Sequence, residues 1–341
     1  MLSQHEGAPS GAAQANGQGL DLVVIGDCNP DVLVLGHDVT PEFGQQEKLV
    51  DSMSLVIGGS AAITAVAAAR LGLSVALVAT VGADPAGQFM LDQLAREGVR
   101  TDAVTVRDDV PTGMTVALSR GGDRAILTAL GAVAALTAAY VPDGLLARAR
   151  HVHASSYFLL ERSLGPGLAE VFADARATGV TTSLDTNWDP AGKWGDGRLT
   201  AAISQTGLLL PNEAEALHLS GQPDLAGAAR ALTAGGATLV VKRGEHGALC
   251  VEGGTQHQVS LPPVTPVDAT GAGDCFNAGL IAGLLGGRDL TGAVALGCAA
   301  GALSTRAPGG TAGCPDLATA AALAEAAAIT DAAQAGLAAR G

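Results

Sequence analysis

An acidic residue ends a glycine-rich turn late in the chain, in the run Val267-Asp268-Ala269-Thr270-Gly271-Ala272-Gly273-Asp274-Cys275-Phe276. We expect an apolar helix directly after it, over 276–285. A glycine-rich turn that opens a helix lets backbone N–H groups converge on an anion, and the helix dipole helps to hold it. An aspartate is unfavourable beside a phosphate, so Asp274 should have a function there. The obvious function is to accept the proton of a hydroxyl that attacks the phosphate. The alternative is a plain turn in which Asp274 caps the helix.

A second polar pair, Asn212 and Glu215, follows an apolar strand at the expected start of another helix. Residues three apart in a helix share one face, so the two side chains should lie together. A helix cap followed by a surface acid is the alternative to a functional role.

The elements that must position these residues alternate between short apolar runs and Ala-rich stretches of helical length. The expected strands are 20–26, 74–81, 151–153, 180–184, 208–210 and 238–242, and the expected helices include 60–71, 85–97, 165–178 and 225–234. This alternation predicts an α/β fold, with a mostly parallel sheet covered by helices on both faces.

Two segments, 31–58 and 102–130, break this rhythm with strand-like alternation and turn residues. Within the second, 112–119 and 124–127 should pair as a hairpin. We therefore expect a small β-sheet lid inserted into one α/β domain that spans 20–325. Residues 1–19 should form a disordered tail and 326–341 a C-terminal helix or tail.

The composition excludes several classes of protein. The chain has 341 residues, 19 Lys+Arg against 33 Asp+Glu, and a net charge of -14. An acidic chain without a basic cluster is a poor ligand for nucleic acid or anionic lipid. The apolar stretch 276–303 is broken by charges and glycines, so two buried helices are expected there instead of a membrane span. The five scattered cysteines, with no C-x-x-C, predict reduced thiols and a cytoplasmic location.

Four stretches in order resemble the signatures of the PfkB/ribokinase family of carbohydrate kinases. Gly58-Gly59-Ser60-Ala61-Ala62 resembles its N-terminal Gly-Gly signature, and Asn212-Glu213-Ala214-Glu215 resembles its N-x-x-E motif. Val241-Lys242-Arg243-Gly244-Glu245-His246-Gly247 resembles the strand and loop beside the nucleotide. The turn that ends at Asp274 resembles the D-T-x-G-A-G-D signature. The resemblance covers about residues 20–313.

The resemblance implies a Rossmann-like α/β domain with a β lid, and transfer of the γ-phosphoryl group of ATP to an alcohol. Asp274 would be the catalytic base, and the backbone of Thr270, Gly271, Ala272 and Gly273 the anion hole. Asn212, Lys242, Gly244, Gly247 and Thr270 would bind ATP. Glu215 would organise Mg²⁺ through water, since hard Mg²⁺ keeps oxygen ligands and several waters. Asp268 matches part of the site for a monovalent cation such as K⁺, which we leave open.

On the substrate side, Asp31 matches the aspartate that binds sugar hydroxyls in this family, because a carboxylate can accept from two adjacent hydroxyls. Asp27 is better explained as a turn former. Gly58 and Gly59 would let the backbone approach the sugar closely. Ile63 replaces the usual asparagine, and Glu161 aligns with an acidic substrate contact, although a helix-cap or surface position explains Glu161 as well.

We therefore expect an ATP-dependent kinase of a sugar or sugar-like alcohol that forms a homodimer through the lid. A nucleoside kinase of the same family is the nearest alternative. A catalytically silent sugar-binding regulator would lack the acid of the turn, which is present. A dinucleotide oxidoreductase is disfavoured, because Gly26-Asp27-Cys28-Asn29-Pro30 stands where G-x-G-x-x-G would follow the first strand.

Overall fold

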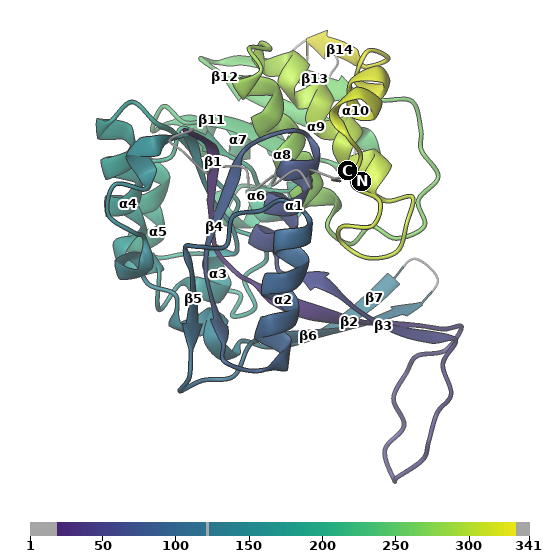
Figure 1. Cartoon of the computed structure of the whole chain (residues 1–341). Coiled ribbons are helices and arrows are strands. Elements are labelled where there is room, and N and C mark those ends of the chain that lie inside the picture. Colours follow the sequence, from purple (N-terminus) through teal and green to yellow (C-terminus); the bar gives the residue numbers. More distant parts are fainter. Residues whose placement is uncertain (1–18, 121–122, 332–341) are drawn as a thin grey trace, which may run out of the picture.

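A large, mostly parallel sheet organises the structure, a computed structural model that describes residues 19–331 except 121–122 (Figure 1). Within this part of the chain the sheet has ten strands, in the order β14 (Ala328–Asp331), β13 (Thr255–Ser260), β12 (Ala248–Glu252), β11 (Thr238–Lys242), β10 (Leu208–Leu209), β9 (Thr181–Leu184), β8 (Ala149–Ala154), β1 (Leu20–Ile25), β4 (Val75–Gly82) and β5 (Val104–Arg107). The strands from β11 to β5 pair in parallel. Strands β12, β13 and β14 add an antiparallel edge.

Helices cover both faces of this sheet, as the alternation of strands and helices predicts. They are α1 (Ser60–Arg70), α2 (Pro85–Arg96), α3 (Tyr157–Leu160), α4 (Gly165–Ala177), α5 (Gly197–Ser204), α6 (Glu213–Ser220), α7 (Leu225–Thr233), α8 (Ala272–Leu285), α9 (Leu290–Ser304) and α10 (Leu317–Ala324). Short 3₁₀ helices, η1 (Gly131–Ala135), η2 (Ala138–Tyr140), η3 (Leu146–Arg148) and η4 (Gly244–His246), lie in the connections.

The central strand β1 shows how the sheet separates two apolar layers. Leu22 and Val24 pack into the core cluster that includes residues of α1, α2, α8, α9 and α10. Val23 and Ile25 point to the opposite face, into the cluster with α4, α5, α6 and α7. Successive side chains of a strand alternate between faces, so a strand buried on both sides is apolar throughout. This explains why the parallel strands are continuous apolar runs in the sequence.

A separate small sheet projects to one side of the main body (Figure 1). Its order is β3 (Ser52–Gly58), β2 (Asn29–Leu35), β6 (Met114–Arg120) and β7 (Asp123–Ala129). Strands β6 and β7 form the expected hairpin, with Met114 opposite Ala129. Strand β2 joins the two chain segments, since it pairs with β3 on one side and with β6 on the other.

The structure corrects two expected boundaries. The second small-sheet segment begins at β6 and not at residue 102, because β5 pairs with β4 in the large sheet. The segment 326–341 is not simply a helix or tail, since β14 pairs with β13 at the edge of the sheet. Residues 1–18 of the expected N-terminal tail and residues 332–341 lie outside the described residues.

The apolar stretch 276–303 forms two helices, α8 and α9, which pack against each other as expected. No helix in the described part of the chain has both the length and the apolarity that a bilayer span needs.

Candidate active site

Polar residues gather at the carboxyl ends of the parallel strands. Asp27 follows β1, Asp185 follows β9, Asn212 follows β10, and Lys242 is the last residue of β11. The carboxyl ends of parallel strands meet at one edge of an α/β sheet, which is where such folds bind their ligands. The topology therefore brings Asp27, Asp185, Asn212 and Lys242 to the same edge of the large sheet.

The glycine-rich turn enters the same region at the start of α8. Gly271 has φ 72°, in the left-handed range, and a Cβ there would lie 2.7 Å from the Cα of Gly310. Only glycine fits this position without strain. A Cβ on Gly273 would lie 3.5 Å from the Nζ of Lys242, so the ammonium group sits beside the turn. The turn thus combines a helix N-terminus with a nearby cation, both of which favour a bound anion.

Asp274 lies in the first turn of α8 and is only 7% exposed. Burial raises its pKa well above the ordinary value, and the charge of Asp185 raises it further, against the lowering effect of Lys242. The hydroxyl of Ser60, at the start of α1, donates a hydrogen bond to it. A buried carboxyl with a raised pKa is a stronger base than a surface aspartate once it is ionised.

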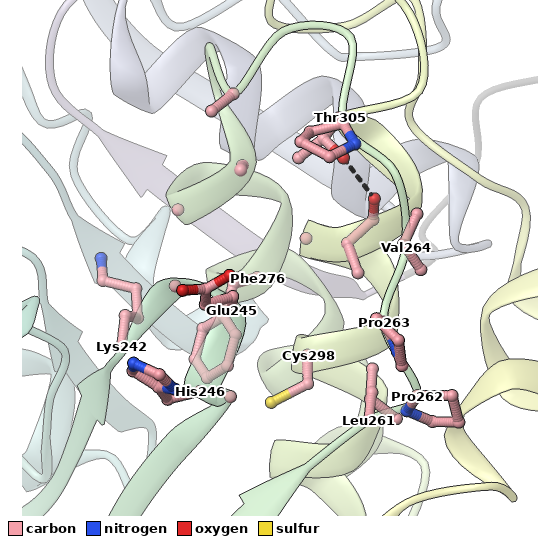
Figure 2. A pocket seen from close by; sticks show the side chains of 18 residues that line it. Lys242, Glu245, His246, Leu261, Pro262, Pro263, Val264, Phe276, Cys298 and Thr305 are labelled. Carbon is pink, nitrogen blue, oxygen red and sulfur yellow. Dashed lines mark hydrogen bonds between the residues drawn. The ribbon is translucent and has the colours of Figure 1, made fainter. Parts of the chain in front are cut away.

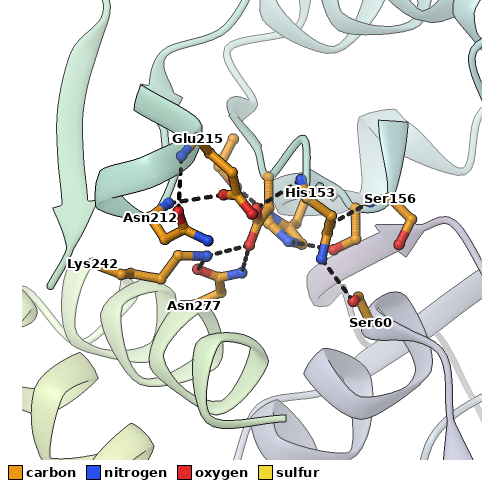
Figure 3. A network of polar contacts seen from close by, with 11 residues as sticks. Ser60, His153, Ser156, Asn212, Glu215, Lys242 and Asn277 are labelled. Carbon is orange, nitrogen blue, oxygen red and sulfur yellow. Dashed lines mark hydrogen bonds and ion pairs between the residues drawn. The ribbon is translucent and has the colours of Figure 1, made fainter. Parts of the chain in front are cut away.

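Asp185 is the centre of a buried polar network between β9, β11 and α8. Its Oδ2 accepts from the ammonium of Lys242, and from the Nδ2 of Asn277 at 2.6 Å. Figure 3 shows Lys242, Asn277 and Glu215 pointing into this common space. The charges of Asp185 and Glu215 raise the pKa of Lys242, against the effect of its burial, so the ammonium stays protonated.

Asn212 and Glu215 form a reciprocal capping box at the start of α6. The Oε2 of Glu215 accepts from the backbone N–H of Asn212, and the Oδ1 of Asn212 accepts from the N–H of Glu215, both at 2.8 Å. The helix-cap explanation is therefore correct, but the surface-acid part is not, because Glu215 is 5% exposed. Burial and the charge of Asp185 raise the pKa of Glu215 to about 7.

Asp27 has a structural role, but it caps helix α1 and is not the turn former that was expected. It is buried, and its carboxylate accepts from the N–H groups of Ser60 and Ala61 at 3.0 and 2.9 Å. These are free donors of the first turn of α1, which Asp27 caps from another part of the chain. The cap fixes Ser60 where it can reach Asp274.

Asp31 is the acid that the small sheet contributes. It is 8% exposed, and its Oδ1 accepts from the Nδ2 of Asn29 at 3.1 Å. Burial and the charge of Asp27 raise its pKa to about 7, against hydrogen bonds from Thr115 and Asn29. A Cβ on Gly58 would lie 1.9 Å from the Oδ1 of Asp31, so glycine at 58 is needed for this carboxylate to occupy its place.

Arg124 links the small sheet to the glycine-rich turn. Its Nη1 donates to the Oγ1 of Thr270 at 2.8 Å and lies 3.7 Å from Asp268. Although burial raises the pKa of Asp268, hydrogen bonds from Gly309 and Thr270 lower it overall. The carboxylate of Asp268 therefore connects the turn to the 309–310 loop. The positive charge of Arg124 also acts on Asp31, where it lowers the pKa against the larger effect of burial.

A cavity of about 560 Å³ opens on the other side of the turn, between η4, the 261–266 segment and helices α8 and α9 (Figure 2). Its polar lining includes Lys242, Glu245, His246 and Thr305, and Gly244, Gly247, Ala272 and Gly273 contribute backbone. The rest is mainly apolar: Leu261, Pro262, Pro263, Val264, Pro266, Ala269, Phe276, Cys298, Gly301 and Ala302. Mostly apolar walls with a few convergent polar groups are typical of a cofactor or nucleotide pocket.

The structure places the remaining predicted residues less centrally. Ile63 is 4% exposed in the core cluster, and its side chain packs on Gly310. This buried position argues against the substrate contact that was expected for Ile63. Glu161 is partly exposed at the end of α3, 3.8 Å from the guanidinium of Arg198. Thr270 and Asn212 are not among the residues that line the cavity.

Sequence reasoning missed two groups of the site, Asn277 and Arg124. Asn277 is, with Asp185, a partner of Lys242, and Arg124 links the small sheet to the glycine-rich turn. Asp185 carries a usable signal, since an acid directly after an apolar strand stands at the carboxyl edge of the sheet. Asn277 and Arg124 carry no such signal, because their partners are 35 and 146 residues away in the sequence.

The model of the pfkB family of carbohydrate kinases matches residues 20–317. The chain belongs to this family and is accordingly a kinase that acts on a sugar or nucleoside.

Two curated relatives and one solved structure show the extent of the similarity. The chain is 32% identical to a ribokinase of Bacillus subtilis over 296 residues, with 86% of this chain and 96% of that protein covered. It is 31% identical to a 2-dehydro-3-deoxygluconokinase of the same organism, with 78% and 86% covered. A putative ribokinase II from E. coli in complex with ATP and Mg²⁺ has a TM-score of 0.79 and 25% identity, and 90% of this chain and 99% of that chain are covered.

Proposed function

We propose that this kinase transfers the γ-phosphoryl group of ATP to a hydroxyl of a sugar or sugar-like alcohol, with Asp274 as the general base. One observation carries the proposal: a buried carboxyl with a raised pKa lies in the first turn of α8, directly after Gly273, which lines the cavity. In phosphoryl transfer, a positioned carboxylate can accept the proton of the attacking hydroxyl while nearby groups stabilise the charge of the phosphate.

The order of events follows from the side chains. The ionised Asp274 accepts the proton of the attacking hydroxyl as the oxygen approaches the phosphorus. The backbone N–H groups of Gly271, Ala272 and Gly273 and the ammonium of Lys242 face the negative charge that is transferred. Because these groups are fixed before reaction, they stabilise the transition state without reorganising. Asp185 and Asn277 hold Lys242 in position.

ATP fits the cavity beside α8 and α9. We propose that its phosphates approach the turn past Lys242, while Gly244 and Gly247 of the η4 loop flank the nucleotide. The apolar walls suit a flat base that is removed from water. Thr270 contributes its backbone, since its hydroxyl is held by Asp268 and Arg124.

Magnesium fits an outer-sphere arrangement. In the described part of the chain there is no group of three or more His, Cys, Asp or Glu that could hold a metal ion by itself. We propose that Glu215 and Asn212 would hold Mg²⁺ through water molecules, beside the phosphates of the nucleotide. When bound there, the ion would supply positive charge against the phosphates.

The surroundings of Asp268, the residue expected to bind K⁺, do not suit a cation. Both oxygens of Asp268 accept hydrogen bonds, and the guanidinium of Arg124 lies 3.7 Å away. We assign no K⁺ site to these residues, and a comparison of rates in K⁺ and Na⁺ tests this directly.

The alcohol should bind between Asp31 and Asp274, with the backbone of Gly58 and Gly59 alongside. Asp31 stands in a row across the small sheet with Val56, Thr115 and Thr128, so these residues share one face. Glu161 is a candidate for a more distant contact with the same substrate.

The opposite face of the small sheet supports a homodimer. The neighbouring row, Leu55, Val32, Val116 and Leu127, is apolar, and Leu55 and Leu127 are 45% and 62% exposed. A second copy of this face would cover the row. If it does, Leu127→Asp should convert a dimer to a monomer in light scattering, whereas a monomeric wild type would exclude this interface.

The function is tested by an ATP-consumption screen over sugars, sugar acids, polyols and nucleosides with Mg²⁺. We expect sustained turnover with one sugar or sugar acid. Preference for a nucleoside would transfer the assignment to a nucleoside kinase. ATP binding without turnover on any class would favour the silent regulator.

A further inference from the structure

Two of the five cysteines meet directly behind the glycine-rich turn. The Sγ of Cys275 and the Sγ of Cys314 lie 2.8 Å apart, and both approach the carbonyl oxygen of Gly310. The cysteines are both free and buried. Cys28, Cys250 and Cys298 make no thiol–thiol hydrogen bond among those found in the described residues, so this pair is distinctive.

We propose that Cys275 and Cys314 form a reversible disulfide that senses peroxide and lowers the activity of the kinase. The sulfurs need to approach by less than an ångström, since a disulfide bond is about 2.05 Å long. Cys275 and Cys314 are 39 positions apart in the sequence, and the fold already brings their sulfurs close together. Disulfides in reduced compartments are usually of this transient, redox-sensing kind.

Cys314 is the thiol that would react first with a peroxide. It is 8% exposed, whereas Cys275 is fully buried. A hydrogen bond from Cys275 lowers its pKa, against the effect of burial, and the charge of Arg70 adds to the lowering. Arg70 also donates to the carbonyl of Cys314 at 3.4 Å, which keeps the guanidinium beside this residue. Thiolates near arginine are the reactive form of cysteine.

The chemistry balances with a hydroperoxide as the oxidant. The Cys314 thiolate attacks one peroxide oxygen, the O–O bond breaks, and the departing hydroxide becomes water, which leaves a sulfenic acid. The sulfur of Cys275 then attacks the sulfenic sulfur. The S–S bond forms, and hydroxide leaves with the proton of Cys275 as a second water. The two thiols lose two electrons, and the peroxide is reduced by two.

The position of the pair connects this bond to catalysis. Cys275 directly follows Asp274 in α8, and its N–H donates to the carbonyl of Gly271. Cys314 ends the loop whose Gly309 donates to Asp268 and whose Gly310 packs against Gly271. A shift of about 1 Å in such a turn can cost on the order of 100-fold in rate. We therefore expect the oxidised enzyme to have a kcat at least ~tenfold lower.

The test treats the full-length enzyme with hydrogen peroxide at one equivalent, followed by peptide mapping and thiol titration in denaturant. We expect the loss of two of the five thiols, a Cys275–Cys314 linked peptide lighter by two hydrogens, and full reversal by dithiothreitol. Cys314→Ser should prevent the link, whereas the matched control Cys250→Ser, in β12, should still form it.

Activity is measured on the same samples. This part rests on the proposed kinase function, whereas the linked peptide needs no substrate and can fail independently. Recovery of kcat with dithiothreitol, and insensitivity of Cys314→Ser to peroxide, support the proposal. A missing link, a link to another cysteine, or a complete link with unchanged kcat would overturn it.

Discussion

The two regions that meet at the turn 270–273 differ in chemistry. The cavity beside α8 and α9 has mostly apolar walls, with Lys242 at the end that faces the turn. The region under the small sheet instead holds buried acids, Asp31 and Asp27, with amide and hydroxyl partners. Apolar contact is non-directional and supplies affinity, whereas a site built to bind hydroxyls rejects molecules that lack them. Nucleotide affinity and substrate choice should therefore respond to different residues.

The largest effect is expected at the point where the two regions meet. Asp274→Asn removes the base but keeps the shape of the side chain, so kcat should fall by ~10²–10⁴. ATP affinity, measured by calorimetry, should stay within a few-fold of wild type. Turnover near the wild-type rate would remove Asp274 from the mechanism.

Asp31→Ala should damage only the acidic region. The loss of a charged hydrogen bond costs roughly 1.5–3 kcal/mol, which corresponds to about a tenfold to hundredfold drop in kcat/KM for the alcohol. The KM for ATP should not change. Gly58→Ala is a matched control, because the new methyl group would displace the Asp31 carboxylate and should reproduce the defect while Asp31 is retained. Equal losses for ATP and alcohol would show that the regions are not separate.

Ala302→Phe addresses the apolar region in the same way. Ala302 lines the cavity, and a ring there overfills it, at a cost of about 1–3 kcal/mol. The KM for ATP should rise by about tenfold, and the dissociation constant of the alcohol should remain unchanged. Isothermal titration with each ligand alone distinguishes the two effects. A weaker alcohol complex with intact ATP binding would show that the cavity binds the alcohol and not ATP.

The pH dependence of alcohol binding should follow Asp31. Its pKa is raised to about 7, so the carboxylate is protonated below that pH and loses its capacity to accept two hydroxyls. Alcohol affinity should therefore decrease as the pH falls through about 7, by up to ~tenfold per unit. The titration belongs in the Asp274→Asn background, where Asp274 cannot contribute. Affinity that is flat between pH 6 and 8 would contradict this role.

The smallest effect is expected at the magnesium organiser. Glu215→Gln keeps an oxygen for the capping box but removes the charge, so the Mg²⁺ concentration for half-maximal rate should rise a few-fold. The melting temperature should change little. An unchanged magnesium requirement would leave Glu215 with its structural role alone.

The sequence was sufficient for the fold class, because the apolar runs of β1, β4 and β11 and the Ala-rich helices report burial directly. The sequence could not show which of the two sheets contains β5. Its four residues, Val104–Arg107, alternate like a small-sheet strand, and only the parallel pairing with β4 places them in the large sheet. Likewise, β14 is a short strand whose partner lies about 70 residues earlier, so local pattern gave no signal.

The site was predictable where chemistry is encoded in adjacent residues. The turn that ends at Asp274 and the pair Asn212 and Glu215 are local motifs. In the structure, Asp274 lies in the first turn of α8, and Asn212 and Glu215 are hydrogen-bonded to each other. Ile63 shows the limit. Its position beside the Gly-Gly signature suggested a substrate contact, but the side chain instead packs on Gly310, a distant residue. Side-chain direction at a helix start depends on tertiary packing, which one sequence does not reveal.

The most direct test of the two-region account follows the γ-phosphoryl group itself. ATP labelled at the γ-phosphorus is incubated with the best alcohol from the screen, and labelled products are separated and counted. We predict one labelled phosphorylated alcohol for each ADP formed by the wild type, and almost none with Asp274→Asn despite intact ATP binding. ADP formed with the label released as inorganic phosphate would contradict direct transfer between the two regions.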